Sequence, residues 1–170
     1  ARMNTEAARL GMTNSRFTNV TGLSNPQHYS TAADLARLAA GVIRDYPEYY
    51  PLYAQKEFRY NNITQPNRNR LLWTDPTVDG VKTGHTEAAG WCLIASALRG
   101  DRRVLAVVLG ASSDAARASE AQKLLNWGFQ AFDTVQLYQS GKQVTTLRVW
   151  KGDRPEVPAG FLADRYLTLP

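Results

Sequence analysis

Residues 78–111, VDGVKTGHTEAAGWCLIASALRGDRRVLAVVLGA, decide the fold class. They contain two apolar runs, GWCLIASALRG and DRRVLAVVLGA, which are joined by the turn Arg99-Gly100-Asp101-Arg102. Apolar runs joined by a short turn that contains glycine predict an antiparallel hairpin. Because both runs are apolar on both faces, we expect a central sheet covered by helices. The expected fold class is therefore α+β, with an antiparallel sheet.

Helical segments lie before and after this hairpin. Apolar residues at helical spacing predict a helix over residues 1–10, with Gly11 as a left-handed stop. A second helix is expected to begin after Thr31, because Thr31 and Asp34 have the spacing of a capping box. A third covers residues 113–132 and has an apolar face that should pack on the sheet.

Three intervening segments lack such regular spacing. Residues 13–30 are rich in Asn, Ser, Thr and Gly, which favours an ordered loop. Residues 46–60 interleave tyrosines with prolines and should form a short helix followed by an extended piece. Residues 61–80 combine clustered Asn with two more prolines, so we expect a long loop near a functional surface, with the apolar segment 71–73 packed beneath it.

The character of the sequence changes after residue 132. From there onward apolar and polar residues roughly alternate around the turn Ser140-Gly141-Lys142, which predicts strands. We therefore assign residues 1–132 to one domain and residues 133–170 to the start of a second, β-rich domain. That second segment is too short for an independent core of the usual size, and residue 1 is an alanine with no signal-peptide core after it. Both ends look cut, so we expect a piece of a longer polypeptide.

Composition argues against several classes of protein. The 170 residues include 20 Lys+Arg and 15 Asp+Glu, which gives a net charge of +5. The basic residues are scattered instead of forming a stripe, which argues against a nucleic-acid partner. The longest apolar stretch, 104–109, is far shorter than the roughly 20 residues of a membrane-spanning helix. The single cysteine, Cys92, excludes an internal disulfide, and its apolar neighbours predict a buried thiol.

The clearest chemical signature is the run Lys82-Thr83-Gly84-His85. It ends a predicted strand bordered by glycines, where small residues let a peptide backbone lie alongside the strand. Residues 78–111 occur here together with GLSNPQHYSTAADLARLAAGVIRDYPEYY, NRNRLLW and KLLNWGFQAFDTV. In this combination the chain resembles, over nearly its whole length, the low-molecular-mass penicillin-binding proteins. These are the serine-type D-alanyl-D-alanine carboxypeptidases of peptidase family S11.

The resemblance implies a fold, an activity and a location. The fold would be the helix-covered antiparallel sheet of penicillin-binding proteins and β-lactamases, with residues 82–85 on an edge strand. The parent enzyme would trim the terminal D-alanine from peptidoglycan stem peptides through an acyl-enzyme, and β-lactam antibiotics would acylate it. It would need no metal or organic cofactor. It would work in the periplasm or on the extracytoplasmic face of the cytoplasmic membrane, attached only through a region that this chain does not contain.

The nucleophile of that family is expected elsewhere. In the family a Ser-x-x-Lys motif supplies the nucleophile, and a Ser-x-Asn motif assists proton transfer. No serine of this chain has Lys three positions later or Asn two positions later. We therefore expect the nucleophile on an upstream segment of the same polypeptide, without which this chain could not form an acyl-enzyme. The alternatives are a non-catalytic fragment, a binding homologue without its serine, or a related β-lactamase or endopeptidase.

The resemblance gives roles to the four residues of the motif. Lys82 would be catalytic, as a fixed positive charge that stabilises the charge developing during acyl transfer; the alternative is an exposed lysine at a strand end. Thr83 would hydrogen-bond the terminal carboxylate of the substrate, unless it serves only strand propensity. Gly84 would leave room for the bound peptide, with a turn glycine as the alternative. His85 would line the cleft wall.

Two arginines complete the predicted site. Arg117, in the first turn of the last predicted helix, would hold the anionic end of the peptide. The alternative is a solvated surface arginine, which is disfavoured because a cation is poorly placed at a helix amino terminus unless an anion is nearby. Arg68, within NRNRLLW, is a second candidate for the same contact.

Overall fold

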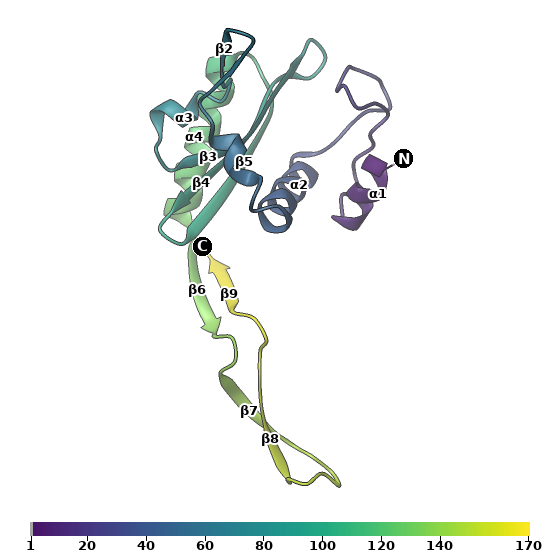
Figure 1. Ribbon diagram of the computed structural model, residues 1–170, viewed down its shortest axis with the longest axis vertical. Helices are drawn as coiled ribbons and strands as arrows, with labels where there is room; N and C mark the ends of the chain where they lie inside the picture. Colours follow the sequence, from purple (N-terminus) through teal and green to yellow (C-terminus); the bar gives the residue numbers. More distant parts are fainter. Residues whose placement is uncertain (1) are drawn as a thin grey trace. The chain divides into compact units, whose positions relative to one another are not determined.

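The computed structural model describes residues 2–170. The chain divides into two compact units, residues 1–128 and residues 129–170, and each is described by itself. The first unit contains the sheet, the larger helices and all six predicted site residues. Figure 1 shows both units.

The sheet of the first unit has three antiparallel strands in the order β3-β4-β5. They are β3 (Val78–Thr86), β4 (Gly90–Arg99) and β5 (Arg102–Ala111). The predicted hairpin is confirmed as β4–β5, with Ala95 opposite Ala106 and Arg99 opposite Arg102. Ala95 and Ala97 are fully buried, and Leu93 is 1% exposed. The central strand is therefore the core of the sheet, as its uniformly apolar sequence predicts.

Helices cover this sheet, and the structure confirms the α+β class. Helix α2 (Ala32–Asp45) packs against β5, and α4 (Asp114–Ala131) runs alongside the three strands (Figure 1). Gly128 of α4 lies close to Val104 of β5. A Cβ added to Gly128 would be 2.8 Å from Cγ1 of Val104. Glycine at this position therefore permits the close approach of α4 to β5.

The predicted helix signals act as expected. The Thr31 side chain accepts a hydrogen bond from the backbone N–H of Asp34 at 3.2 Å, which caps α2. Ser113 caps α4 in the same way, since its Oγ accepts from the N–H of Ala116 at 3.0 Å. Helix α1 (Arg2–Arg9) is followed by Gly11 at φ +73°, the left-handed conformation that ends helices.

The loop over residues 13–30 is held by one buried carboxylate. Asp34 is fully buried and accepts hydrogen bonds from the Ser15 hydroxyl at 2.7 Å and the Asn14 backbone N–H at 2.8 Å. Arg37 donates to its other oxygen at 2.6 Å. The Ser15 hydrogen bond is the main reason that the pKa of Asp34 lies below its usual value. The expected ordered loop is thus tied to the first turn of α2.

The structure of residues 46–80 confirms one prediction and shows that another is wrong. A 3-10 helix, η1 (Tyr50–Ala54), and the extended strand β1 (Glu57–Tyr60) follow the predicted order. The expected long loop over residues 61–80 is wrong, because β1 pairs with β2 (Ile63–Pro66) and the short helix α3 (Leu71–Thr74) follows. The turn is Asn61-Asn62, with φ of 47° and 59°. Asparagine tolerates this left-handed region, so the clustered Asn form a hairpin turn and not an irregular loop.

Two predictions of burial are also corrected. Leu71 and Leu72 of α3 are buried as expected, but Trp73 is 45% exposed. Cys92 is only half-buried, because successive side chains of a strand point to opposite faces and Leu93, Ala95 and Ala97 take the buried face of β4. The Cys92 thiol reaches the backbone oxygen of Ala89 at 3.4 Å.

Asp75, directly after α3, joins three elements of the first unit. Its carboxylate accepts from the N–H and hydroxyl of Thr77 at 2.9 Å and 2.6 Å, from Gln122 of α4 at 2.9 Å, and from Arg99 of β4 at 3.2 Å. Burial raises the pKa of such a group, but these donors outweigh burial and lower the pKa of Asp75 to about 2.

The second unit consists of two strand pairs. β6 (Asp133–Tyr138) pairs with β9 (Arg165–Leu169), and β7 (Gln143–Arg148) pairs with β8 (Glu156–Gly160), all antiparallel. The strand-like alternation of the sequence is confirmed. Among residues 2–170, no helix combines the length and apolarity that crossing a membrane requires.

Candidate active site

The strand β3 presents the predicted motif at the margin of the sheet. Within residues 2–170 it pairs with β4 alone, so its other edge carries no strand. The edge-strand prediction for residues 82–85 is confirmed. Lys82, Gly84 and His85 are exposed, and Thr83 is half-buried. An extended peptide could hydrogen-bond to this edge through its backbone.

Open space surrounds Gly84. A Cβ built on this residue would meet one heavy atom within 4 Å, the Cβ of Cys92 at 3.9 Å, which is an ordinary van der Waals contact. Its φ lies outside the left-handed region, in contrast to Gly90 at +65°. The alternative of a turn glycine therefore does not describe Gly84, because it lies inside a strand and opposite Cys92.

Arg117 reaches this strand from α4 and is 3% exposed. One guanidinium nitrogen, Nη1, donates to the backbone oxygens of Gly84 at 3.1 Å and Cys92 at 3.3 Å. The other, Nη2, pairs with the Asp114 carboxylate, and the guanidinium lies 5.0 Å from the ring centre of Trp91. The alternative of a solvated surface arginine is wrong. Asp114 is the nearby anion that a cation at a helix amino terminus requires.

Three cations act on one another at the motif. Lys82 projects from the strand, and its Nζ donates to the backbone oxygen of Thr83. Partial burial lowers the pKa of the Lys82 ammonium below its usual value, and the charges of Arg68 and Arg117 lower it further. The three positive charges outnumber the one carboxylate, Asp114, that pairs with Arg117, so the arrangement suits a ligand that carries a carboxylate.

Arg68 lies on an exposed segment that its neighbours hold in place. Asn69 is 2% exposed and donates through Nδ2 to the backbone oxygen of Gly80 in β3 at 2.9 Å. Its backbone N–H donates to Asn67 Oδ1 at 2.9 Å. Arg70 forms an ion pair with Asp114 of α4. Sequence reasoning missed both Asn69 and Arg70, although the repeated Asn in NRNR is a signal for side chains that bond the nearby backbone.

His85 packs against an aromatic side chain. Its ring centre lies 4.0 Å from that of Trp91, at an interplanar angle of 34°, and the two residues face each other across the β3–β4 pair. Trp91 in turn contacts Arg117, so a row of three side chains follows one side of the motif. Within residues 2–170, no group of three or more His, Cys, Asp or Glu side chains could hold a metal ion.

A second polar cluster, also missed from sequence, holds the beginning of β3. The Tyr50 hydroxyl donates to Asp79 at 2.9 Å, and Arg103 donates to Asp79 at 2.7 Å and to Ser96 at 2.6 Å. Burial is the main cause that raises the pKa of Tyr50 to about 12. A Cβ on Gly80 would lie 2.5 Å from the Tyr50 hydroxyl. Glycine at position 80 is therefore a packing requirement, in contrast to Gly84.

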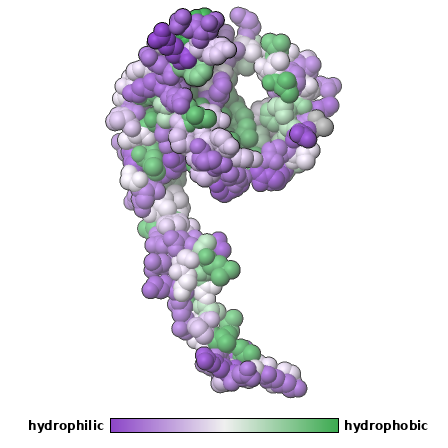
Figure 2. All heavy atoms as spheres, viewed as in Figure 1, coloured by the Kyte–Doolittle hydropathy of each residue, from purple (hydrophilic) through white to green (hydrophobic). Residues whose placement is uncertain are grey.

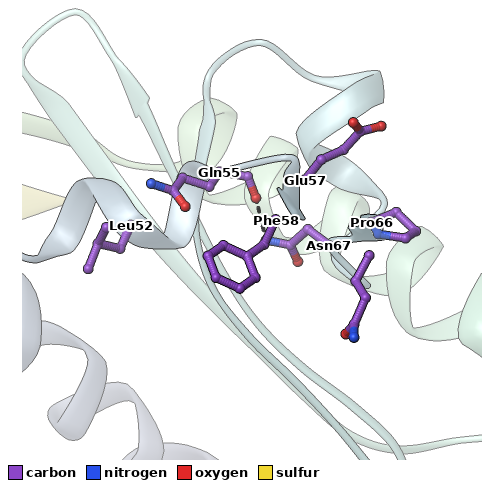
Figure 3. Close-up of a pocket in the computed structure, with 7 residues that line it drawn as sticks. Leu52, Gln55, Glu57, Phe58, Pro66 and Asn67 are labelled. Carbon is purple, nitrogen blue, oxygen red and sulfur yellow. Dashed lines mark hydrogen bonds between the residues drawn. The ribbon is translucent and has the colours of Figure 1, made fainter. Parts of the chain in front are cut away.

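A pocket of about 250 Å³ lies beside η1 and the β1–β2 hairpin (Figure 3). It is lined by Leu52, Gln55, Glu57, Phe58, Gln65, Pro66 and Asn67. The six predicted site residues, all within the described chain, are absent from this lining. In Figure 2 the polar surface is interrupted by a hollow where apolar residues gather. The candidate site at the open edge of β3 is therefore distinct from this pocket.

Comparison with known proteins agrees with this geometry. The family model "D-alanyl-D-alanine carboxypeptidase" (Peptidase S11) matches residues 1–113, and the model of the C-terminal domain of penicillin-binding protein 5 matches residues 132–170. The chain belongs to the peptidase S11 family. This result confirms the resemblance on which the roles of the motif depend, while the roles themselves stay predictions.

Individual relatives show how much of the family's length is present. The D-alanyl-D-alanine carboxypeptidase DacC of Escherichia coli is 48% identical over 169 residues, which cover 99% of this chain and 42% of DacC. Penicillin-binding protein 5 of Haemophilus influenzae superposes with a TM-score of 0.92 at 43% identity, over 99% of this chain and 50% of that one. Penicillin-binding protein D2 of Listeria monocytogenes, solved in a cefotaxime-bound form, gives 0.71 at 32% identity, over 76% of this chain and 54% of that one. The chain therefore spans about half or less of these relatives.

Proposed function

We propose that this chain forms the Lys-Thr-Gly wall of a serine-type D-alanyl-D-alanine carboxypeptidase that trims peptidoglycan stem peptides. The observation that carries the proposal is the open edge of β3, where the space over Gly84 adjoins the charges of Lys82, Arg68 and Arg117. A peptide that ends in a carboxylate needs this combination, because its backbone can add to the strand while its charge meets the cations.

Each residue has a role in this reaction. The Lys82 ammonium stabilises negative charge that develops when the scissile carbonyl becomes tetrahedral. The Thr83 hydroxyl hydrogen-bonds the terminal carboxylate, and Arg117 and Arg68 supply a positive field around it. Gly84 leaves the space that the substrate backbone occupies, and His85 lines one side. The attacking serine and its lysine come from sequence outside this chain, because no serine here has a lysine three positions later.

β-Lactams are the second class of ligand in this proposal. The Listeria relative was solved in cefotaxime-bound and ampicillin-bound forms. A β-lactam with a carboxylate presents the same charge to Lys82 and Thr83 as the end of the peptide does. The substrate is cell-wall peptidoglycan, so the protein would act in the periplasm or on the extracytoplasmic face of the cytoplasmic membrane.

Labelled penicillin tests the proposal. The full-length polypeptide that carries this chain is incubated with the label, separated by denaturing electrophoresis, and the intact mass of every band is measured. We expect covalent label outside residues 1–170, and loss of labelling in Lys82→Ala without loss of folding. Label on a serine within residues 1–170 would refute the placement of the nucleophile. Absence of label would refute catalysis and favour a binding homologue without its serine.

A further inference from the structure

Asp114 is a carboxylate that joins Arg117 of the candidate site to Arg70, the neighbour of Asn69. It lies in the first turn of α4 and is the ion-pair partner of Arg117 through Oδ1 and of Arg70 through Oδ2. Its side chain is 22% exposed, whereas that of Arg117 is 3% exposed. Both oxygens of this carboxylate are therefore occupied by guanidinium groups.

The ion pair between Asp114 and Arg117 affects the position of β3. Arg117 Nη1 donates to the backbone oxygens of Gly84 and Cys92, so its position sets where the end of β3 lies relative to β4. With Nη2 held by Asp114, the guanidinium cannot turn away from these oxygens without breaking an ion pair. A nearly buried guanidinium that lost its carboxylate would keep only backbone oxygens and the face of Trp91 as partners.

The ion pair with Arg70 holds the Asp114 carboxylate itself. Residues 67–70 are attached to β3 by Asn69, which donates to Gly80, and to α4 by Arg70, which pairs with Asp114. Arg68 lies between Asn69 and Asn67, and Asn67 donates to the backbone oxygen of Gln55 at 3.0 Å. The place of Arg68 therefore does not depend on the Arg70 pair. What that pair fixes is the Asp114 carboxylate, through the oxygen that Arg117 does not use.

We propose that Asp114 is a positioning residue: itself held by Arg70, it fixes Arg117 so that the guanidinium charge stays beside the strand edge where the ligand carboxylate would lie. The inference rests on the proposed function and adds a residue that the Lys-Thr-Gly motif does not contain. The charges of Asp114 and Arg70 cancel, so those of Arg68, Lys82 and Arg117 remain to attract an anion. The carboxylate thus orients Arg117 without neutralising the group.

The test compares two penicillins in the full-length polypeptide that carries this chain. One is benzylpenicillin with its free carboxylate, and the other is its methyl ester, which has no charge for the cations to meet. Acylation rates are measured by intact mass for the unmodified protein, Asp114→Asn, Arg70→Gln and Lys123→Gln. The last variant is the matched control, because it removes one lysine charge from the exposed Lys123–Glu120 pair on the same helix.

We expect Asp114→Asn to slow acylation by benzylpenicillin about tenfold or more and Arg70→Gln to slow it by a smaller factor, with little change for the ester in either variant. The Arg70 side chain is 66% exposed, so Arg70→Gln should leave the fold intact. Lys123→Gln should match the unmodified protein with both compounds. Equal loss for acid and ester, or no loss for either, would overturn the proposal, because a purely structural ion pair does not distinguish the two.

A measurement without activity separates this inference from the proposed function. If neither penicillin acylates the unmodified protein, the proposed function is wrong. The ¹⁵N resonance of the Arg117 guanidinium then decides the positioning by itself. We expect a slowly exchanging signal that broadens in Asp114→Asn, and an unchanged signal in that variant would refute the role of Asp114.

Discussion

Replacing Gly84 by alanine would test whether the ligand, and not the fold, needs the open space over this residue. The added methyl group would have only the Cys92 Cβ nearby, at 3.9 Å, and the backbone of Gly84 lies outside the left-handed region. The folded protein therefore gains no clash. Alanine also restricts the unfolded chain more than glycine does, which adds about 0.4–1 kcal/mol of stability at compatible positions.

The same methyl group would occupy the space over the strand edge that the ligand backbone needs. Overfilling a packed contact costs about 1–3 kcal/mol, which corresponds to acylation slower by a factor of roughly 5 to 150. We expect Gly84→Ala to keep or raise the melting temperature while the acylation rate by penicillin falls by that factor. Thermal unfolding gives the melting temperature, and intact mass gives the acylation rate, on the same full-length preparation.

Gly80→Ala is the matched control on the same strand. There the methyl group would lie 2.5 Å from the Tyr50 hydroxyl, so the Tyr50–Asp79 hydrogen bond must shift and the melting temperature should fall. Wild-type acylation by Gly84→Ala would refute the clearance role of Gly84. A melting temperature of Gly84→Ala as low as that of Gly80→Ala would refute the geometry on which the argument depends.

Three further variants test charge and hydrogen bonding. Thr83→Val removes the hydroxyl and should lower kcat/KM for a peptide with a free carboxylate about tenfold or more, since a hydrogen bond to a charged group contributes about 1.5–3 kcal/mol; an equal loss for the peptide amide would argue against that contact. The pKa of Lys82 is lowered, so its charge is present below that pKa and lost above it. Acylation should therefore decline at lower pH than for an ordinary lysine, and in Lys82→Arg any activity that remains should lose this alkaline limb. Asp75 has a pKa of about 2, below its unfolded value, so its stabilisation is present above the unfolded pKa and lost as the pH falls toward 2. Asp75→Asn should cost about 2 kcal/mol in urea unfolding at pH 7, and a loss that persists unchanged near pH 2 would refute the charge argument.

Local signals in the sequence predict much of the first unit. The hairpin β4–β5 follows from two apolar runs around Gly100, and α2 follows Thr31, whose side chain caps its first turn. The Asp34 carboxylate, which the spacing of a capping box would return to Thr31, is bonded instead to the loop before it and to Arg37. The β1–β2 hairpin was missed because Asn61-Asn62 is a turn signal that also occurs in irregular loops. Only the pairing of the flanking strands distinguishes a hairpin turn from an irregular loop.

The candidate site also has a part that the sequence predicts and a part that it does not. The motif Lys82-Thr83-Gly84-His85 is contiguous, so the resemblance to a family locates it at once. The residues that hold it in place come from distant segments: Asn69 bonds Gly80, and Arg70 pairs with Asp114. The repeated Asn of NRNR indicates bonds to the nearby backbone, but not to which strand or helix, because each of these contacts depends on how the elements pack in three dimensions.

The half-buried thiol of Cys92 is a position at which a spectroscopic label could be attached. It is the one cysteine of the chain, and strand pairing puts it directly opposite Gly84. Arg117 contacts the backbone oxygen of Cys92 and not its side chain, so that bond does not depend on the identity of residue 92. A fluorinated group attached to this sulfur would sit across the β3–β4 pair from Gly84, near the space that a Cβ on Gly84 would occupy. Fluorine NMR could then report a ligand over Gly84 directly, without any chemical turnover.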